Sequence, residues 1–412
     1  MMPKLKISGI GWLGEIPEHW TIGRIGGLYS VRKEKVSDKD YQPLSVTMKG
    51  IVPQLETAAK TNDGDNRKLV RKGDFAINSR SDRRGSCGIS EYDGSVSLIN
   101  TVLTPRTEMN PQYYNWLFHT TQFADEFYKW GHGIVDDLWT TNWQEMKKIS
   151  IPLPPLDEQE NIAHFLNIKC ARVDELIQDI QDQLETLEQY KRSVVVEIVT
   201  NGLNHDADRK DSGIQWIGEI PKHWDCIRGK YIFKYIQKPT KDTDGVITCF
   251  RDGEVTLRSK RREDGFTISE KEIGYQGIDV GDLVVHGMDG FAGAIGISDS
   301  RGKASPVLNV LETEQNKKYM MYFLRSMAYG DVFLATATGI RVRSCDLRWN
   351  KLAEFFYPVP PMDEQAAMVE YIDSILEKTN ALISDKKAQL ETLNNYKKSI
   401  IFEYVTGKKE VV

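Results

Sequence analysis

The sequence predicts an α/β protein of two similar globular modules that are joined by two long, antiparallel coiled-coil helices and related by a pseudo-twofold internal repeat. Three observations support this fold class. Residues 8–20 (SGIGWLGEIPEHW) recur as residues 212–224 (SGIQWIGEIPKHW), and residues 152–159 (PLPPLDEQ) recur as residues 358–365 (PVPPMDEQ). A helical pattern follows each copy of the second motif. The repeat unit is half of the chain, much longer than the roughly 20 to 50 residues of solenoid repeats.

The repeat divides the 412 residues into four segments in the order module, helix, module, helix. We expect the first module at residues 1–150, the first helix at 151–208, the second module at 209–357 and the second helix at 358–412. At roughly 150 residues per domain, this length suits two or three domains. The chain is 40% hydrophobic and 10% aromatic, which is enough to build a core in each module.

The two connecting segments have the pattern of long amphipathic helices. Their apolar residues recur every three or four positions, and polar or charged residues fill the other faces, which is typical of a coiled-coil seam. Each helix should begin near the Asp-Glu-Gln that follows the prolines, and should end at the glycine of residues 200–202 or 406–407. The expected seam residues are Ile177, Ile180, Leu184, Leu187, Ile383, Leu390 and Leu393.

The order of the segments constrains how the helices pack. The second module follows the end of the first helix, and the second helix follows the second module. If the two helices pack on each other, the two copies are equivalent only when the helices are antiparallel. Helices of about 40 residues would then form a rod of roughly 60 Å with a module at each end. The alternative, two unrelated amphipathic helices in separate cores, does not explain why residues 183–187 (QLETL) recur at 389–393.

The interiors of the modules differ more than their boundaries do. Residues 21–132 and 225–338 share only scattered similarities, such as a turn that leads into an apolar strand at residues 72–77 and again at 280–285. A duplicated scaffold with two different interiors is what two different recognition specificities require.

These motifs resemble those of one known family, the specificity subunits of type I restriction-modification systems. The resemblance rests on the paired Pro-x-Pro-Pro-x-x-Glu-Gln segments at 152–159 and 358–365 and on the paired Gly-x-Ile-Pro-x-x-Trp openings at 14–20 and 218–224. It covers the whole chain, and it implies a non-catalytic DNA reader. Each module would be a target recognition domain for one half of a bipartite double-stranded DNA target, and the helices would set the distance between the halves.

The resemblance also implies partners: two methyltransferase subunits and, for restriction, translocase-nuclease subunits. No cofactor or metal is expected. The five cysteines form no CxxC pair, and we find no signal peptide and no run of about 20 apolar residues, so we expect a soluble cytoplasmic protein. The net charge of −5 does not argue against DNA, because the acidic excess lies in the helical segments. Residues 151–208 have 12 Asp and Glu against 4 Lys and Arg.

Apparent catalytic motifs fail on inspection. Asn110-Pro111-Gln112-Tyr113 lacks the second proline of the Asn-Pro-Pro-Tyr motif of adenine methyltransferases. The glycine-rich residues 290–296 have no clear helix after them, and residues 296–303 have the wrong spacing for a phosphate loop. The seven histidines, including His19 and His223 within the repeat, suit packing or capping better than metal binding.

Candidate DNA contacts follow from side-chain chemistry, since arginine and small hydroxyl residues suit phosphates and guanine edges. The loop at residues 76–86 and the pair Arg341 and Arg343 are the strongest candidates. A second group comprises the basic run near residue 260 and the turn at 286–290, which matches residues 78–82 of the first module. The full set is Arg80, Ser81, Arg83, Arg84, Arg258, Lys260, Arg261, His286, Arg341 and Arg343. For each cluster, a solvated charged loop is the alternative.

A competing function class is a two-headed protein-interaction scaffold in which the coiled coil is only a spacer. DNA binding by phosphate contacts weakens steeply with salt. Mobility-shift assays on random-sequence duplex at low and moderate salt would therefore distinguish the two classes.

Overall fold

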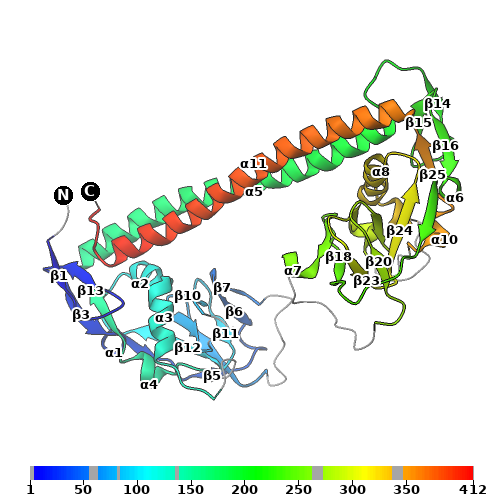
Figure 1. The fold of residues 1–412 in the computed structure, drawn as a ribbon. Helices are drawn as coiled ribbons and strands as arrows, with labels where there is room; N and C mark the ends of the chain where they lie inside the picture. The colour runs from blue at the N-terminus through cyan, green and yellow to red at the C-terminus, as the bar shows by residue number, and fades with distance from the viewer. Residues whose placement is uncertain are drawn as a thin grey trace. The chain divides into compact units, whose positions relative to one another are not determined.

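The computed structural model describes residues 4–54, 64–80, 84–134, 139–261, 272–335 and 347–411. The chain forms two compact units (Figure 1). Unit 1 comprises residues 1–181 and 387–412, and unit 2 comprises residues 182–386. Each unit therefore contains one module and a part of both long helices.

The first module is mainly β structure with short helices. Its strands are β1 (Leu5–Ile7), β2 (Glu15–Pro17), β3 (Thr21–Arg24), β4 (Tyr29–Val31), β5 (Lys35–Val36), β6 (Leu44–Thr47), β7 (Gly50–Pro53), β8 (Arg67–Val70), β9 (Phe75–Asn78), β10 (Cys87–Ile89), β11 (Gly94–Val96), β12 (Asn100–Pro105) and β13 (Ser150–Leu153). Its helices are α1 (Ile25–Leu28), α2 (Pro111–Phe118), α3 (Thr121–Lys129) and α4 (Trp143–Met146).

The second module has the same kinds of elements in a similar order. Its strands are β14 (Arg209–Asp211), β15 (Glu219–Pro221), β16 (Asp225–Arg228), β17 (Phe233–Ile236), β18 (Ile247–Cys249), β19 (Val255–Leu257), β20 (Gln276–Ile278), β21 (Leu283–His286), β22 (Ile295–Ile297), β23 (Gly302–Ala304), β24 (Leu308–Thr313) and β25 (Phe356–Val359). Its helices are α6 (Gly229–Ile232), α7 (Arg258–Arg261), η3 (Gly290–Ala292), α8 (Lys317–Tyr329), α9 (Val332–Ala335) and α10 (Trp349–Leu352).

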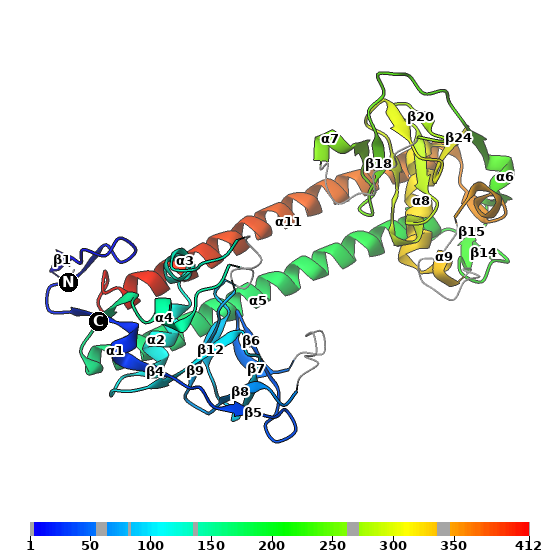
Figure 2. The same cartoon turned by 90° about the horizontal axis from the view of Figure 1, so that it is seen from below.

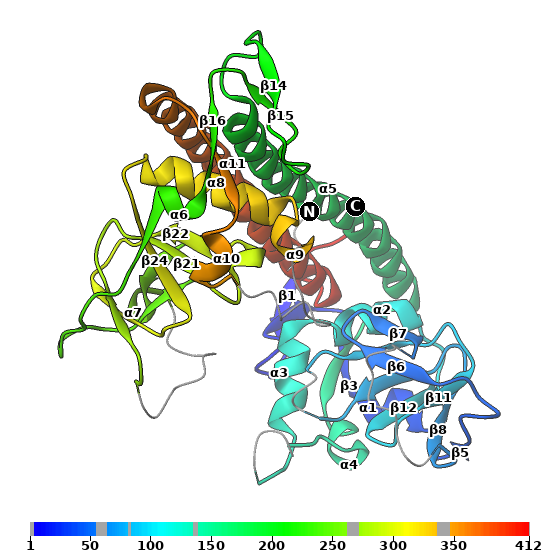
Figure 3. The ribbon, with the colours of Figure 1, turned by 90° about the vertical axis from the view of Figure 1, so that its right-hand side faces the viewer.

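Both modules have a four-stranded antiparallel sheet with matching strand order. The order is β10-β9-β12-β4 in the first module and β22-β21-β24-β17 in the second. Successive side chains of a strand point to opposite faces of its sheet. In the central strands β9 and β21, the two faces are buried in different clusters. In β21, Leu283 and Val285 pack in the core that contains α8, while Val284 packs in the smaller core with β18 and β20. Figure 3 shows α8 running across this sheet.

The long helices are α5 (Leu156–Asn201) and α11 (Met362–Val405). They are antiparallel in both units: in unit 1, Lys397 of α11 pairs with Asp174 of α5 at 2.6 Å, and in unit 2, Ile198 and Ile372 belong to one core. This architecture confirms the predicted fold class. Of the expected seam residues, Ile180 and Ile383 are buried, and Ile177, Leu184, Leu187, Leu390 and Leu393 are half-buried.

The duplicated sequence motifs form duplicated contacts between the modules and the helices. In unit 1, Glu158 in the first turn of α5 accepts a hydrogen bond from Trp20 Nε1 at 2.9 Å and lies 2.6 Å from His19 Nε2. Unit 2 has the same contacts, at the same distances, from Trp224 and His223 to Glu364 in the first turn of α11. His19 and His223 thus help to attach a helix start to its module.

The glutamine of each Asp-Glu-Gln makes a second attachment. In unit 1, Gln159 Nε2 donates to the carbonyl of Pro154, and the backbone N–H of Asn110 donates to Gln159 Oε1. Gln365 makes the matching bonds in unit 2, with Pro360 and Asn316. These contacts explain why the motif occurs twice.

The C-terminal end of each long helix also attaches to a module. Tyr113 of α2 donates a 2.7 Å hydrogen bond to the carbonyl of Val405, the last residue of α11. The hydroxyl of its repeat counterpart, Tyr319 of α8, lies 3.4 Å from the carbonyl of Val199, near the end of α5, and 3.1 Å from the carbonyl of Pro358. The end of α11 and β1 lie at the same end of unit 1 (Figure 2). Gly407, at φ +68°, packs against Trp20, so its positive φ and the absence of a side chain are both required.

An aspartate in the turn before the central strand anchors each sheet. Asp74 accepts two hydrogen bonds from the Arg32 guanidinium, at 2.7 and 3.0 Å, and Asp282 accepts two from Lys238, at 2.7 and 2.8 Å. Arg32 and Lys238 each follow the edge strand of their sheet, β4 or β17. Each pair thus joins the start of the interior strand β9 or β21 to the chain segment that follows the edge strand β4 or β17.

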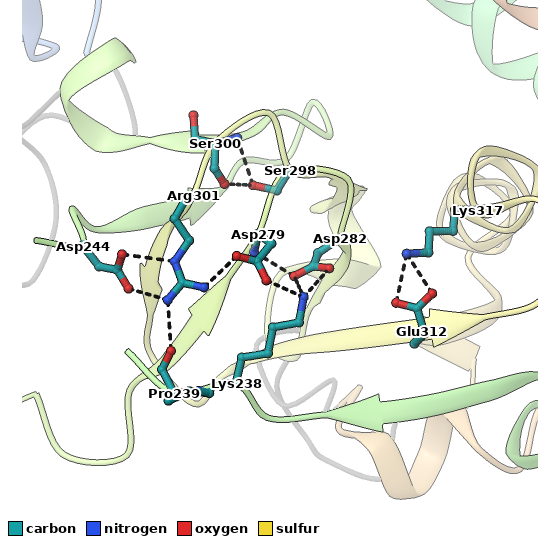
Figure 4. A network of polar contacts seen from close by, with 10 residues as sticks. All are labelled: Lys238, Pro239, Asp244, Asp279, Asp282, Ser298, Ser300, Arg301, Glu312 and Lys317. Carbon is teal, nitrogen blue, oxygen red and sulfur yellow. Dashed lines mark hydrogen bonds and ion pairs between the residues drawn. The ribbon is translucent and has the colours of Figure 1, made fainter. Parts of the chain in front are cut away.

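In the second module this pair belongs to a larger alternating network of acids and bases (Figure 4). Lys238 also bonds Asp279 at 2.9 Å, and the Arg301 guanidinium lies between Asp279, at 2.6 Å, and Asp244, at 2.8 Å. Charge-assisted hydrogen bonds are stronger than neutral ones. The network therefore fixes three separate segments of the module against one another.

The network predicts acid sensitivity of the second module. The hydrogen bond from Arg301, followed by that from Lys238, lowers the pKa of Asp279 from its ordinary value of 3.8 to about 2. A carboxylate whose pKa is lower in the folded state adds stability above its unfolded pKa and loses it as the pH falls through the folded pKa. We expect the free energy of unfolding of this module to fall between about pH 4 and pH 2. Urea denaturation across this range should show a smaller fall in the free energy of unfolding for Asp279→Asn than for the unsubstituted chain. An equal fall in the two proteins would exclude Asp279 as a source of the acid sensitivity.

Candidate nucleic-acid interface

The structure describes six of the ten candidate DNA contacts. Ser81, Arg83, Arg341 and Arg343 lie outside the described residues. Arg80 and Arg84 lie in unit 1, and the remaining four lie in unit 2, on α7 (Arg258, Lys260 and Arg261) or at the end of β21 (His286).

In the first module, Arg80 and Arg84 line one cavity beside the end of β9. The Arg84 guanidinium lies over the ring of Tyr128, 3.7 Å from its centroid, and Tyr128 in turn packs against Trp139. Asp125 is 3.4 Å from Arg84, and both side chains are about half exposed. Arginine stacked on an aromatic ring keeps its edge donors available for a phosphate or a base.

In the second module, the structure brings three candidates from distant parts of the sequence together. Arg258, Arg261 and His286 line a cavity of about 670 Å³. Lys260 is not among its lining residues; it bonds Ser300 at 2.7 Å and Asp299 at 3.2 Å.

Several positive charges at this cavity have internal partners. Arg261 bonds both carboxylate oxygens of Asp252, at 2.7 and 3.0 Å, and Glu254 at 2.7 Å. Its guanidinium also lies 4.0 Å from the centroid of the Phe250 ring. Arg258 donates to Thr248 Oγ1 at 2.9 Å. The basic run therefore helps to build the wall of the cavity.

Two further residues of the cavity were missed in the sequence. Arg251, at the tip of the β18–β19 hairpin, donates to Asp289 Oδ1 at 2.9 Å. Its side chain is 63% exposed. The hairpin sequence Arg251-Asp252-Gly253 was the available signal, because Asp-Gly marks a tight turn that presents its neighbours. Asp289 lies within the predicted turn at 286–290 but carried no expected role.

His286 has a defined orientation at the end of β21. The backbone N–H groups of Met288 and Asp289 donate to its Nδ1, at 3.2 and 3.0 Å. The proton of the neutral ring is therefore on Nε2. Burial lowers the pKa of His286, which favours the neutral ring. Asn78 occupies the matching position in the first module, where its Oδ1 accepts from the N–H of Arg80.

A second cavity, of about 490 Å³, is also lined by Arg251 and Asp252. Here Arg192 of α5 and Arg325 of α8 lie over the ring of Tyr329, 5.5 and 5.7 Å from its centroid. Within the described part of the chain, neither of these two arginines forms an ion pair with a carboxylate.

The motifs rejected as catalytic have structural roles. Asn110 is the N-cap of α2, and its side chain accepts from the N–H of Tyr113. Of the glycines in residues 290–296, Gly290 lies in η3, Gly293 is the C-cap of η3 and Gly296 lies in β22. Residues 296–303 run through two strands, β22 and β23. Among the described residues, no cluster of three or more His, Cys, Asp or Glu could hold a metal ion. No helix in the described ranges is long and apolar enough to cross a membrane.

Comparisons with known proteins agree with this architecture. Residues 17–186 match the family model of the type I restriction modification DNA specificity domain. Two specificity subunits from Methanocaldococcus jannaschii are similar over nearly their whole length. One belongs to the type I restriction enzyme MjaVIII (24% identity, 96% of this chain and 94% of that protein), and the other is the putative MjaX specificity subunit (23% identity, 97% and 96%).

A solved structure has the same fold. It comes from a study of complex assembly and conformational transition of the type I R-M system. Its matching chain superimposes with a TM-score of 0.68, at 14% identity, over 95% of this chain and 98% of that chain.

Proposed function

Because this chain belongs to the family of type I restriction-modification DNA specificity subunits, we propose that each module reads one half of a bipartite DNA target and that α5 and α11 set the gap between the halves. As a specificity subunit it is not itself catalytic, and it acts together with other subunits of the complex. We therefore adopt the DNA-specificity role and not the competing one, a scaffold that binds only proteins.

One observation carries the proposal: the modules share their attachment to the helices but differ where side chains face the cavities. Glu158 and Glu364 make identical contacts with the two openings, and the central sheets have matching strand orders. By contrast, the end of the central strand presents Asn78 in one module and His286 in the other. A constant frame with variable strand ends supports two different half-sites.

We propose that polar and basic residues of the loops and cavities near these strand ends contact DNA. In the first module these are Arg80 and Arg84, with Ser81 and Arg83 from the same loop. In the second module, Arg192 and Arg325 suit phosphates, because arginine binds phosphate oxygens through two parallel donors. Arg258, Lys260, Arg261, His286, Arg341 and Arg343 complete the proposed set.

The repeat also supports two equivalent docking positions for methyltransferase subunits. Leu176 of α5 and Leu382 of α11 are repeat counterparts, and they are 52% and 53% exposed. Tyr190 and Tyr396 are a second matched pair, at 48% and 43%. Large apolar side chains exposed at matched positions indicate surfaces that two copies of one partner can cover. Restriction subunits would join this assembly.

Exchange of one module tests this function. Residues 21–142 would be replaced by the same interval of a related specificity subunit, and the complex with its methyltransferase subunits would be expressed in cells. We expect one half of the methylated motif to change completely and the other half and the gap to stay the same. Methylome sequencing reads all three directly. Changes in both halves, or in neither, would contradict the assignment of one half-site to each module.

A further inference from the structure

We propose that Arg251 and Asp289, together with His286, form the base-reading cluster of the second module and that they select a G·C base pair. The inference rests on the proposed function, in which this module reads one half of the target.

The geometry of Arg251 suits the recognition of guanine. The residue lies at a hairpin tip, its side chain is well exposed, and Asp289 holds one of its terminal nitrogens at 2.9 Å. A carboxylate behind an arginine limits the rotamers that the arginine adopts, so less entropy is lost when the other donors bind. The free donors of such an arginine match the O6 and N7 acceptors of guanine in the major groove.

The negative charge next to Arg251 favours a base over a phosphate as its ligand. A carboxylate beside an arginine weakens its attraction for a phosphate, whereas it does not oppose the neutral edge of a base pair. Carboxylates also accept hydrogen bonds from the N4 amino group of cytosine. Arg251 and Asp289 therefore offer donors for guanine and an acceptor for cytosine, which together are complementary to one G·C pair.

The hydrogen bonds of His286 fix its tautomer. Two backbone N–H groups occupy its Nδ1, so that only Nε2–H is available as a donor. This nitrogen lies 4.0 Å from Asp289 Oδ2, so the donor lies next to the acceptor. All three residues line the cavity of about 670 Å³ and come from two segments more than 30 positions apart in the sequence.

The test uses the complete complex with its methyltransferase subunits and maps methylation on a library of randomised targets. Arg251→Ala should relax one G·C position in the half read by the second module. The preference for that pair over the other pairs should fall about 5- to 150-fold, the range of one bidentate base contact. Asp289→Asn should relax the same position, and Arg251→Lys should retain part of the preference, since lysine also donates to guanine.

Arg228→Ala is the matched control. Arg228 is also an exposed arginine of the second module paired with a carboxylate, that of Glu354 at 3.2 Å, but it lies on β16 outside the cavity. Its substitution should leave the motif unchanged.

Three results would overturn the inference. The first is an unchanged methylation motif with Arg251→Ala. The second is a uniform loss of methylation on all sequences with this variant, which indicates a phosphate contact. The third is a half-site of the unsubstituted protein that contains no G·C pair. Each can occur while module exchange still changes one half of the motif, so the inference can fail separately from the proposed function. A motif relaxed in the half read by the first module would instead contradict the assignment of half-sites as well.

Discussion

Replacing Asp74 with alanine is expected to lower the free energy of unfolding of the first module by about 3 to 5 kcal/mol, the usual cost of removing one partner of a buried ion pair. The Asp74 side chain is 3% exposed. Besides its two bonds with Arg32, it accepts hydrogen bonds from the backbone N–H of Arg71 at 2.9 Å and from Thr104 Oγ1 at 3.2 Å. Alanine would leave the largely buried Arg32 guanidinium without its main partner. Asp74→Asn should have a smaller effect, because it retains the shape and some acceptors.

Glu91→Ala is the matched control for this experiment. Glu91 pairs with Lys72 at 3.6 Å, and both side chains are more than 60% exposed, so the change should cost no more than about 1 kcal/mol. Urea unfolding of the full chain, with hydrogen exchange to locate the affected segments, measures both variants. Equal effects of the two substitutions would show that the Asp74 pair does not anchor the sheet.

The frame of this protein could be predicted from the sequence because the residues that build it are repeated. Glu158 and Gln159 recur as Glu364 and Gln365, and each pair makes the same hydrogen bonds in both units. The helix ends were predictable for a similar reason. Glycine can adopt the positive φ that follows a helix, and Gly202 and Gly407 do so at +74° and +68°.

The matching strand order of the two central sheets was harder to predict from the sequence. Hydrogen bonding in a sheet needs only backbone groups and alternating burial, so very different sequences satisfy it. The ion pairs of Asp74 and Asp282 could not be predicted for another reason. Arg32 in one module corresponds to Lys238 in the other, and each partner is more than 40 positions from its aspartate, so no local pattern indicates the pair.

The candidate site was predicted only in part. Clusters of arginine in the sequence indicated Arg258 and Arg261, whereas the structure places both against other residues of the module. The exposed Arg251 is a single arginine next to an aspartate and a glycine, so it forms no cluster of basic residues in the sequence. Its position depends on a hairpin and a turn that come together only in the folded module. Long-range juxtaposition of this kind cannot be found from composition or spacing.

The central claim is that the helix pair sets the gap between the two half-sites. Ile198 of α5 and Ile372 of α11 belong to one core of unit 2, and an antiparallel alignment of these two residues puts Glu188 close to the level of Ile383. Adding four residues, about one turn, after both Glu188 and Ile383 would lengthen the pair by roughly 6 Å and keep the seam in phase. Adding four residues to one helix only is the control, and it should abolish methylation because the seam on one side of the insertion loses its register.

Methylome sequencing of the double insertion tests this claim most directly. Duplex DNA rises about 3.4 Å per base pair, so the account predicts that both half-sites stay the same while the gap between them grows by about one or two base pairs. Methylation of the original motif with an unchanged gap, at the activity of the parent chain, would contradict the account. The gap would then be set by something other than the length of α5 and α11.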